Sequence, residues 1–272
     1  MKRTHIGRLV VVAAAPLLLI AATVATVGAI TNGSPDGEDH PYVGLAVFKD
    51  SEGVPMWRCS GTLLSPTLFL TAGHCTEAPA ASASIWFESD VDSGIPQNGY
   101  PFGGGTSVSG TPYTHPDYDP SRFYMHDLGV VVLDEPVVKD EYGTLPTLGV
   151  LDALATKRGR QDVSFTAVGY GLQDVQPVVQ AMRVRMQAVL HLVDLRGTAG
   201  IPRGTAVILS GDANTGGTCF GDSGGPLFLG DSTVVAAVTS FGLNGNCGGV
   251  GGGYRVDQAD DLEWLATFGL EP

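Results

Sequence analysis

Short apolar segments recur every ten to twenty residues from Ile30 onward, and turn-forming residues separate them. The segments are rich in Val, Leu, Thr and Phe, whereas clusters of Gly, Pro, Asp or Asn lie between them, which is typical of strands joined by turns. The predicted strands are 43–48, 61–64, 68–72, 130–133, 163–168, 182–192, 205–209, 227–228 and 234–240. With 38 Gly and 17 Pro in 272 residues, this pattern predicts an all-β protein.

One helix is expected, near the C-terminal end of the chain. Within residues 258–268, apolar residues stand at Leu262, Leu265 and Ala266, with Trp264 between them. This spacing predicts a short helix docked on the body of the protein. The length fits one domain or one double-barrel unit over residues 30–272, with a division near 144–157.

The first 29 residues have the organisation of an export signal. Lys2, Arg3 and Arg8 form a basic start, and an apolar run from Leu9 to Ala29 ends in small residues. This order predicts a secretory signal peptide over residues 1–29, cleaved after Ala29. An uncleaved membrane anchor is the alternative, because the run is long enough to span a bilayer. We expect a secreted, extracellular protein with no stable membrane association after the signal is removed.

The charge balance argues against nucleic-acid binding. The formal net charge is −13, and removal of the signal would take away three basic residues and no acidic ones. Such a surface repels a phosphate backbone, and a solvated acidic exterior accounts for it. We therefore expect no nucleic-acid partner. The protein is expected to be a monomer.

Four cysteines, an even number in an exported chain, indicate disulfides. They allow three connectivities, and the pairs Cys59–Cys75 and Cys219–Cys247 would each close a short local loop. A metal site is the alternative, but neither Cys-x-x-Cys nor His-x-x-x-His spacing is present. No metal or other cofactor is expected.

Three segments contain the residue types that nucleophilic catalysis requires. Ser223 lies between glycines in Gly221-Asp222-Ser223-Gly224-Gly225-Pro226, His74 ends Thr71-Ala72-Gly73-His74-Cys75, and Asp127 precedes an apolar strand. A serine hydroxyl needs a base to take its proton, and histidine suits that role near neutral pH. A buried carboxylate can orient the imidazole, and the amides of Gly221 and Ser223 can form an oxyanion hole. We predict His74, Asp127 and Ser223 as a catalytic triad.

These segments resemble the signature segments of the chymotrypsin/trypsin family of serine proteases, in the family's order of His, Asp and Ser. Further similar segments are 59–64, 115–118, 169–171, 240–242 and 254–256. The resemblance implies two six-stranded antiparallel β-barrels, with His74 and Asp127 from the first barrel and Ser223 from the second. It also supports the two disulfide pairings. Ser210 stands where many members have a cysteine, and the missing disulfides suggest a bacterial member.

The resemblance extends to the activation of such proteases. Ile30-Thr31-Asn32-Gly33 is similar to the mature start of the family, in which a new α-amino group pairs with the aspartate before the nucleophile. Here that pair would be Ile30 and Asp222. Because Ala29 precedes Ile30, we hypothesise that signal peptidase itself creates the active terminus. In the simpler interpretation, Asp222 only accepts hydrogen bonds from local amides.

The family pattern also suggests which residues bind substrate. They are Gly217, Thr218, Ser240, Phe241, Gly242 and Gly252. Gly217 stands at the expected pocket base, where enzymes that prefer Arg or Lys carry Asp, and Asp212 lies five positions too early to replace it. An open, uncharged pocket predicts a large apolar or aromatic residue before the cut, although the hydroxyl of Thr218 favours something more polar.

The predicted function is a secreted serine endopeptidase that acts through an acyl-enzyme, with protein or peptide substrates and protein inhibitors as partners. A protease-like binding module without catalysis is the first alternative, although no triad residue is missing. An esterase is the second, but a Gly-Pro-strand pattern follows Ser223 instead of the strand–elbow–helix arrangement of such enzymes. The natural substrate and any calcium dependence stay open.

Overall fold

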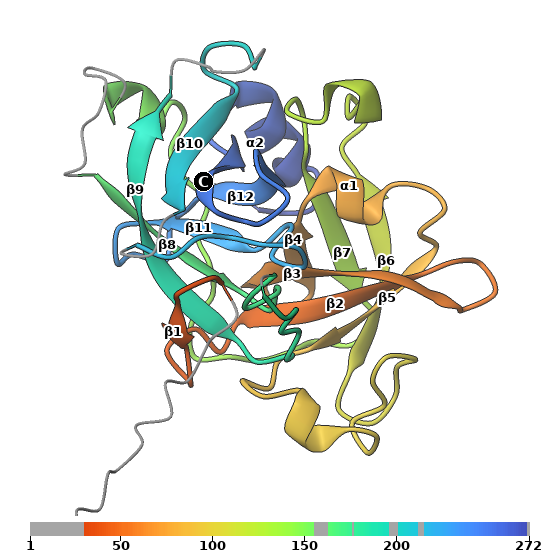
Figure 1. The fold of residues 1–272 in the computed structure, drawn as a ribbon. Coiled ribbons are helices and arrows are strands. Elements are labelled where there is room, and N and C mark those ends of the chain that lie inside the picture. Colours follow the sequence, from red (N-terminus) through yellow and green to blue (C-terminus); the bar gives the residue numbers. More distant parts are fainter. Residues whose placement is uncertain (1–29, 155–162, 176, 196–200, 212–214, 271–272) are drawn as a thin grey trace, which may run out of the picture.

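Two antiparallel sheets, each closed on itself, form the protein (Figure 1). The computed structural model describes residues 30–154, 163–175, 177–195, 201–211 and 215–270. The first barrel has the strand order β2-β3-β4-β7-β6-β5. Its strands are β2 (Val43–Lys49), β3 (Pro55–Ser65), β4 (Leu68–Thr71), β5 (Ser82–Trp86), β6 (Val108–Thr114) and β7 (Gly129–Leu133).

The second sheet has the order β1-β9-β10-β13-β12-β11-β8, and pairing of β8 with β9 closes six of these strands into the second barrel. Its strands are β1 (Ser34–Pro35), β8 (Ser164–Gly169), β9 (Met186–Asp194), β10 (Ala206–Gly211), β11 (Pro226–Leu229), β12 (Val235–Gly242) and β13 (Gly249–Arg255). The two-residue strand β1 adds to β9. The predicted fold of two six-stranded antiparallel barrels is confirmed.

Helices are few in the described residues. They are α1 (Gly73–Thr76), α2 (Ala259–Ala266) and the 3-10 turns η1 (Asp92–Gly94), η2 (Pro120–Arg122) and η3 (Val150–Leu154). The predicted C-terminal helix is confirmed as α2, which buries Leu262 and Leu265. Trp264 packs edge-on against His115, with 4.9 Å between ring centroids, so α2 docks on the loop before the first barrel's last strand.

The interior of the first barrel depends on two glycines. A Cβ atom on Gly44 or Gly61 would lie 3.1 or 2.4 Å from the ring of Phe69, closer than packed atoms approach. Absence of side chains at these positions therefore makes room for the buried aromatic ring, because barrel interiors are filled by inward-facing side chains. The buried cluster continues into the second barrel through Tyr170 and Phe228, which joins the two barrels into one core.

Both disulfides predicted from the sequence are present, and they include all four cysteines. Cys59–Cys75 joins β3 to α1, and Cys219–Cys247 joins the loop before Ser223 to the loop between β12 and β13. Loops of this size restrict the unfolded chain enough to contribute about 3 kcal/mol each.

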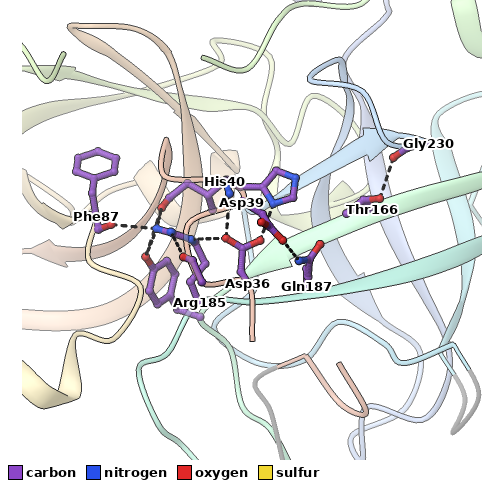
Figure 2. Close-up of polar contacts among 11 residues, drawn as sticks. Asp36, Asp39, His40, Phe87, Thr166, Arg185, Gln187 and Gly230 are labelled. Atoms are coloured by element: carbon purple, nitrogen blue, oxygen red, sulfur yellow. Dashed lines mark hydrogen bonds and ion pairs between the residues drawn. The ribbon is translucent and has the colours of Figure 1, made fainter. Parts of the chain in front are cut away.

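A buried ion pair attaches the N-terminal segment to both barrels (Figure 2). Arg185, at the end of the segment before β9, donates from Nε to Oδ2 of Asp36 over 2.7 Å, and both side chains are fully buried. The Asp36 carboxylate also lies 2.5 Å from Nδ1 of His40. Arg185 donates further to the carbonyls of Gly37 and Phe87. These contacts hold residues 36–40 against the first barrel and β9.

Several predictions fall outside the described residues or differ from the structure. The signal peptide over 1–29 and part of the predicted division at 144–157 lie outside the description. The chain passes from the first barrel to the second between β7 and β8. Four strands were not predicted, namely β1, β5, β6 and β13. No described helix has the length and apolar character needed to cross a membrane.

Candidate active site

His74 and Asp127 meet because their strands pair. β4 runs directly into α1, which contains His74, and Asp127 lies just before β7; Thr71 of β4 pairs with Gly129 of β7. Oδ1 and Oδ2 of Asp127 lie 3.1 and 3.0 Å from Nδ1 of His74, and Oδ1 also accepts the His74 amide over 2.8 Å. The Asp127 side chain is fully buried. Such a carboxylate can orient the imidazole and stabilise its protonated form.

The environment changes the proton affinity of His74. Burial by itself would lower the pKa of His74, but the charge of Asp127 and the hydrogen bond to it outweigh burial and raise the pKa above its ordinary value. The histidine is therefore a stronger base than an isolated imidazole. That property suits a group which must accept a proton from a hydroxyl.

The loop that contains Ser223 lies against the segment before His74. The backbone carbonyl of Ser223 accepts a hydrogen bond from the amide of Ser60 on β3 over 2.8 Å. Gly224 has a positive φ of 75°, and a Cβ atom there would lie 2.0 Å from Oγ1 of Thr71 and 2.6 Å from the nitrogen of Ala72. Only glycine allows this approach. The structure thus brings Ser223 beside the strand end that presents His74, and the Ser223 hydroxyl hydrogen-bonds to no described residue.

The amides of Gly221 and Ser223 donate to no other group in the described part of the chain. The carbonyl of Gly221 is held by the hydroxyl of Ser60 over 2.9 Å, and Gly221 has a positive φ of 99°. Two amides without partners beside a serine can donate to an oxygen that gains negative charge. These are the two donors predicted for the oxyanion hole.

A cavity of about 240 Å³ adjoins Ser223. Four of the six residues predicted to bind substrate line it, namely Thr218, Ser240, Phe241 and Gly242. Six further residues line it that were not predicted to bind substrate, namely Cys219, Phe220, Thr239, Asn244, Gly245 and Cys247. The Cys219–Cys247 pair was the available signal, since it brings the loop after β12 to the loop before Ser223. No charged residue lines this cavity.

Gly217 and Gly252 do not line the cavity. Gly217 exchanges two backbone hydrogen bonds of 2.9 Å with Thr31, which places it beside the N-terminal segment. Gly252 is covered by Phe241, because a Cβ atom at Gly252 would lie 2.1 Å from that ring. Their assignment to substrate binding stays a prediction.

Ile30 and Asp222 are both buried. Ile30 is 0% exposed, has a positive φ of 62°, and is followed by the paired residue Thr31. The Asp222 carboxylate accepts from the amides of Gly171 over 2.8 Å and Cys219 over 2.9 Å. Burial raises the pKa of Asp222 to about 7, because these amides and the charge of Arg58 offset desolvation only in part. No hydrogen bond joins Ile30 to Asp222 in the described chain.

Two histidines outside the predicted triad, His115 and His126, stack on each other beside α2. His126 has a positive φ of 51°, and its ring lies parallel to that of His115, with 5.0 Å between centroids. Both rings face Asp261 of α2, at 3.7 Å from His115 and 4.0 Å from His126. The second nitrogen of His115 accepts from the amide of Asp117. Parallel rings do not aim their in-plane lone pairs at one point, so the arrangement differs from a metal centre.

Comparisons with known proteins find similar sequences and folds. The family model described as Trypsin matches residues 31–262. Serine protease 1 of Drosophila melanogaster is 28% identical over 234 residues, which cover 81% of this chain and 78% of that protein. A protein named Trypsin from Saccharopolyspora erythraea is 26% identical over 219 residues, 75% of this chain and 82% of that protein. The relatives thus include insect and bacterial proteins, and the bacterial origin stays a prediction.

Solved structures show the same fold at low sequence identity. The structure titled HL collagenase superposes with a TM-score of 0.70 at 21% identity, covering 89% of this chain and all of the other. A scabies mite inactivated protease paralogue superposes with a TM-score of 0.67 at 17% identity, covering 89% of this chain and all of that chain. At these identities the likeness concerns the fold alone.

Proposed function

Because the chain belongs to the trypsin family of serine proteases, we propose that it is a secreted endopeptidase that cleaves through Ser223, His74 and Asp127. The observation that carries this proposal is the contact between the buried Asp127 carboxylate and His74, beside the strand end against which the Ser223 loop packs. A base oriented in this way can activate a neighbouring hydroxyl.

In the proposed reaction, Oγ of Ser223 attacks the carbonyl carbon of the substrate while His74 takes the hydroxyl proton. Asp127 stabilises the imidazolium, and the amides of Gly221 and Ser223 donate to the oxyanion. His74 then gives its proton to the leaving amine as the carbon–nitrogen bond breaks, which leaves an acyl-enzyme on Ser223. A water molecule that is deprotonated by His74 attacks the ester, and the proton returns to Ser223 as the acid leaves.

The substrate residue before the cut is proposed to be large and apolar. The cavity next to Ser223 is lined by Phe220 and Phe241 and by small or polar uncharged residues. Without a carboxylate in the lining, it offers no ion pair to Arg or Lys. A panel of peptides that differ only in this residue tests the proposal, and faster cleavage after Arg or Lys than after Phe or Leu would contradict it.

Export and activation are proposed to be one event. Cleavage after Ala29 would create an α-amino group at Ile30, which is already buried and followed by the Thr31–Gly217 pairing. A positive group there would be attracted to the buried carboxylate of Asp222. N-terminal sequencing of secreted, active protein tests this, and a start other than Ile30 would remove the idea. Protein that still begins at residue 1 and is found in the membrane fraction would support the alternative of an uncleaved membrane anchor.

Catalysis itself is tested by comparing wild type with Ser223→Ala on the same peptides. The expected loss of turnover is about 10⁴-fold or more, with an unchanged melting temperature. Labelling by a fluorophosphonate separates the enzyme from a non-catalytic binding module, since only an activated serine reacts. Comparison of peptide with ester turnover separates an endopeptidase from an esterase.

A further inference from the structure

Arg58 lies next to the predicted oxyanion hole without an acidic partner. It is half-buried on β3, where it pairs with Val47 of β2. Its Nε atom is 3.3 Å from the point that a Cβ atom on Gly221 would occupy. In the described part of the chain, its guanidinium makes no hydrogen bond or ion pair. Arg58 therefore places a positive charge beside Gly221 without a carboxylate bonded to it.

This situation is unusual within the molecule. Of the other described arginines, Arg203 is exposed, and four lie within 3.1 Å of an aspartate oxygen, namely Arg122, Arg183, Arg185 and Arg255. The acid that feels the charge of Arg58 is Asp222, but amides of Gly171 and Cys219 bind its two oxygens. The chain has a net charge of −13, yet this half-buried arginine has no carboxylate bonded to it. It is therefore available to bind a carboxylate of another molecule.

Arg58 lies on the side of the site where the substrate residues after the cleaved bond would bind. Cys59, the next residue, is bonded to Cys75, which follows His74. Arg58 does not line the cavity that would hold the residue before the cut. A peptide with that residue in the cavity and its carbonyl oxygen at Gly221 would continue past Gly221 toward Arg58. Residues are spaced by about 3.5 Å along an extended chain, so the first two residues after the cut are within reach of the guanidinium.

A second hollow at this place can receive a side chain. It has a volume of about 280 Å³, and Arg58 lines it together with Trp57 and Tyr100. Aromatic walls would cover the methylene groups of a substrate side chain, and the planar guanidinium matches a carboxylate in shape and charge. A glutamate or aspartate fits this combination better than a lysine, which would be repelled.

We propose that Arg58 gives the enzyme a preference for substrates with aspartate or glutamate at the first or second position after the cleaved bond. The inference rests on the proposed peptidase function and adds the class of substrate. Because the site is half exposed, the expected preference for Asp over Asn at one of these positions is about threefold to tenfold in kcat/KM.

The experiment uses quenched fluorescent peptides that share one apolar residue before the cut. Asp, Asn, Glu, Gln or Lys is placed at the first or the second position after it, and kcat/KM is measured for wild type, R58Q, R58E and R122Q. In R58Q, the ratio of kcat/KM for the Asp peptide to that for the Asn peptide should fall to about one. In R58E, the Lys peptide should be cleaved faster than the Asp peptide. R122Q, whose arginine is exposed and paired with Asp119, should keep the wild-type ratio.

Failure of the inference and failure of the proposed function give different results. If wild type cleaves these peptides but treats Asp and Asn alike, or if R58Q keeps the ratio, the inference is wrong and the peptidase stands. If wild type cleaves neither these peptides nor a p-nitroanilide with the same apolar residue, the proposed function fails. Should R58Q not fold, salt decides: the wild-type ratio should shrink from roughly 0.05 to 1 M ionic strength, and a constant ratio would overturn the inference.

Discussion

The hydroxyl of Ser240 donates a hydrogen bond to Oδ2 of Asp127 over 2.5 Å. Ser240 belongs to β12 of the second barrel, whereas Asp127 precedes β7 of the first. The same carboxylate oxygen lies 3.0 Å from Nδ1 of His74. Ser240 was predicted to bind substrate, and it lines the cavity. Its hydrogen bond also fixes the carboxylate across the junction of the two barrels.

Replacement of Ser240 by Ala should lower kcat/KM by roughly tenfold, because groups that orient a reacting residue through one intermediate contact have effects of this size. The loss should appear mainly in kcat, since the Asp127–His74 contact is misaligned while the cavity remains open. Ser232→Ala, on an exposed turn, is the matched control. Equal kinetics of S240A and wild type would show that His74 alone positions Asp127.

The pH dependence of activity should report on His74. Catalysis needs the neutral imidazole, and the pKa of His74 is raised above its ordinary value of 6.5. Activity should therefore rise with pH through a midpoint above 6.5 in a profile of kcat/KM. Asp127→Asn removes the charge that raises the pKa, so the residual activity of this variant should have a lower midpoint. An unchanged midpoint in D127N would contradict the assigned cause.

Stability of the uncleaved chain should depend on the protonation of Asp222. Its folded pKa of about 7 is raised above the ordinary value of 3.8, so the folded state binds this proton more tightly than the unfolded state does. The resulting stabilisation is complete below about pH 4 and is lost as pH rises through 7. Denaturant unfolding of a chain with a blocked N-terminal extension should show this slope, and D222N should lack it.

A chain that begins at Ile30 provides the comparison. If its α-amino group pairs with Asp222, the carboxylate is stabilised and the loss of stability between pH 4 and 7 should shrink. D222N in this shorter chain should also lose activity. The same pH slope in both chains would argue that the new terminus does not reach Asp222.

Loss of Arg185 should destabilise the fold strongly. Burial alone would raise the pKa of Asp36, but hydrogen bonds from His40 and Arg185 lower it, so Asp36 is charged and buried. Arg185→Met removes one partner, and breaking a buried pair in this way costs about 3–5 kcal/mol. Arg122→Met, at an exposed pair, should change the free energy of unfolding by less than about 1 kcal/mol. Denaturant melts of both variants measure the difference.

The local sequence was sufficient to predict the general architecture and to propose the residues that react. The segments around His74, Asp127 and Ser223 are each contiguous in the sequence. A histidine, a carboxylate and a serine in such segments rarely occur together for another reason. Both disulfides were also predicted. In contrast, β13 was not, because Gly249–Arg255 has few strand-forming residues and pairs with β10 and β12 from distant parts of the chain. Strand formation there depends on long-range pairing more than on intrinsic propensity.

The sequence by itself determined that the chain holds a histidine, a carboxylate and a serine in family order, since short motifs depend on neighbouring residues. Only the tertiary structure decided which residues far apart in the sequence contact one another. Ser240 and Asp127 are 113 positions apart, and Arg185 and Asp36 are 149 apart. Pairing of Gly217 with Thr31, and the Phe241 ring over Gly252, excluded two predicted residues from the cavity. Such contacts depend on how the barrels close and pack together, which no local pattern contains.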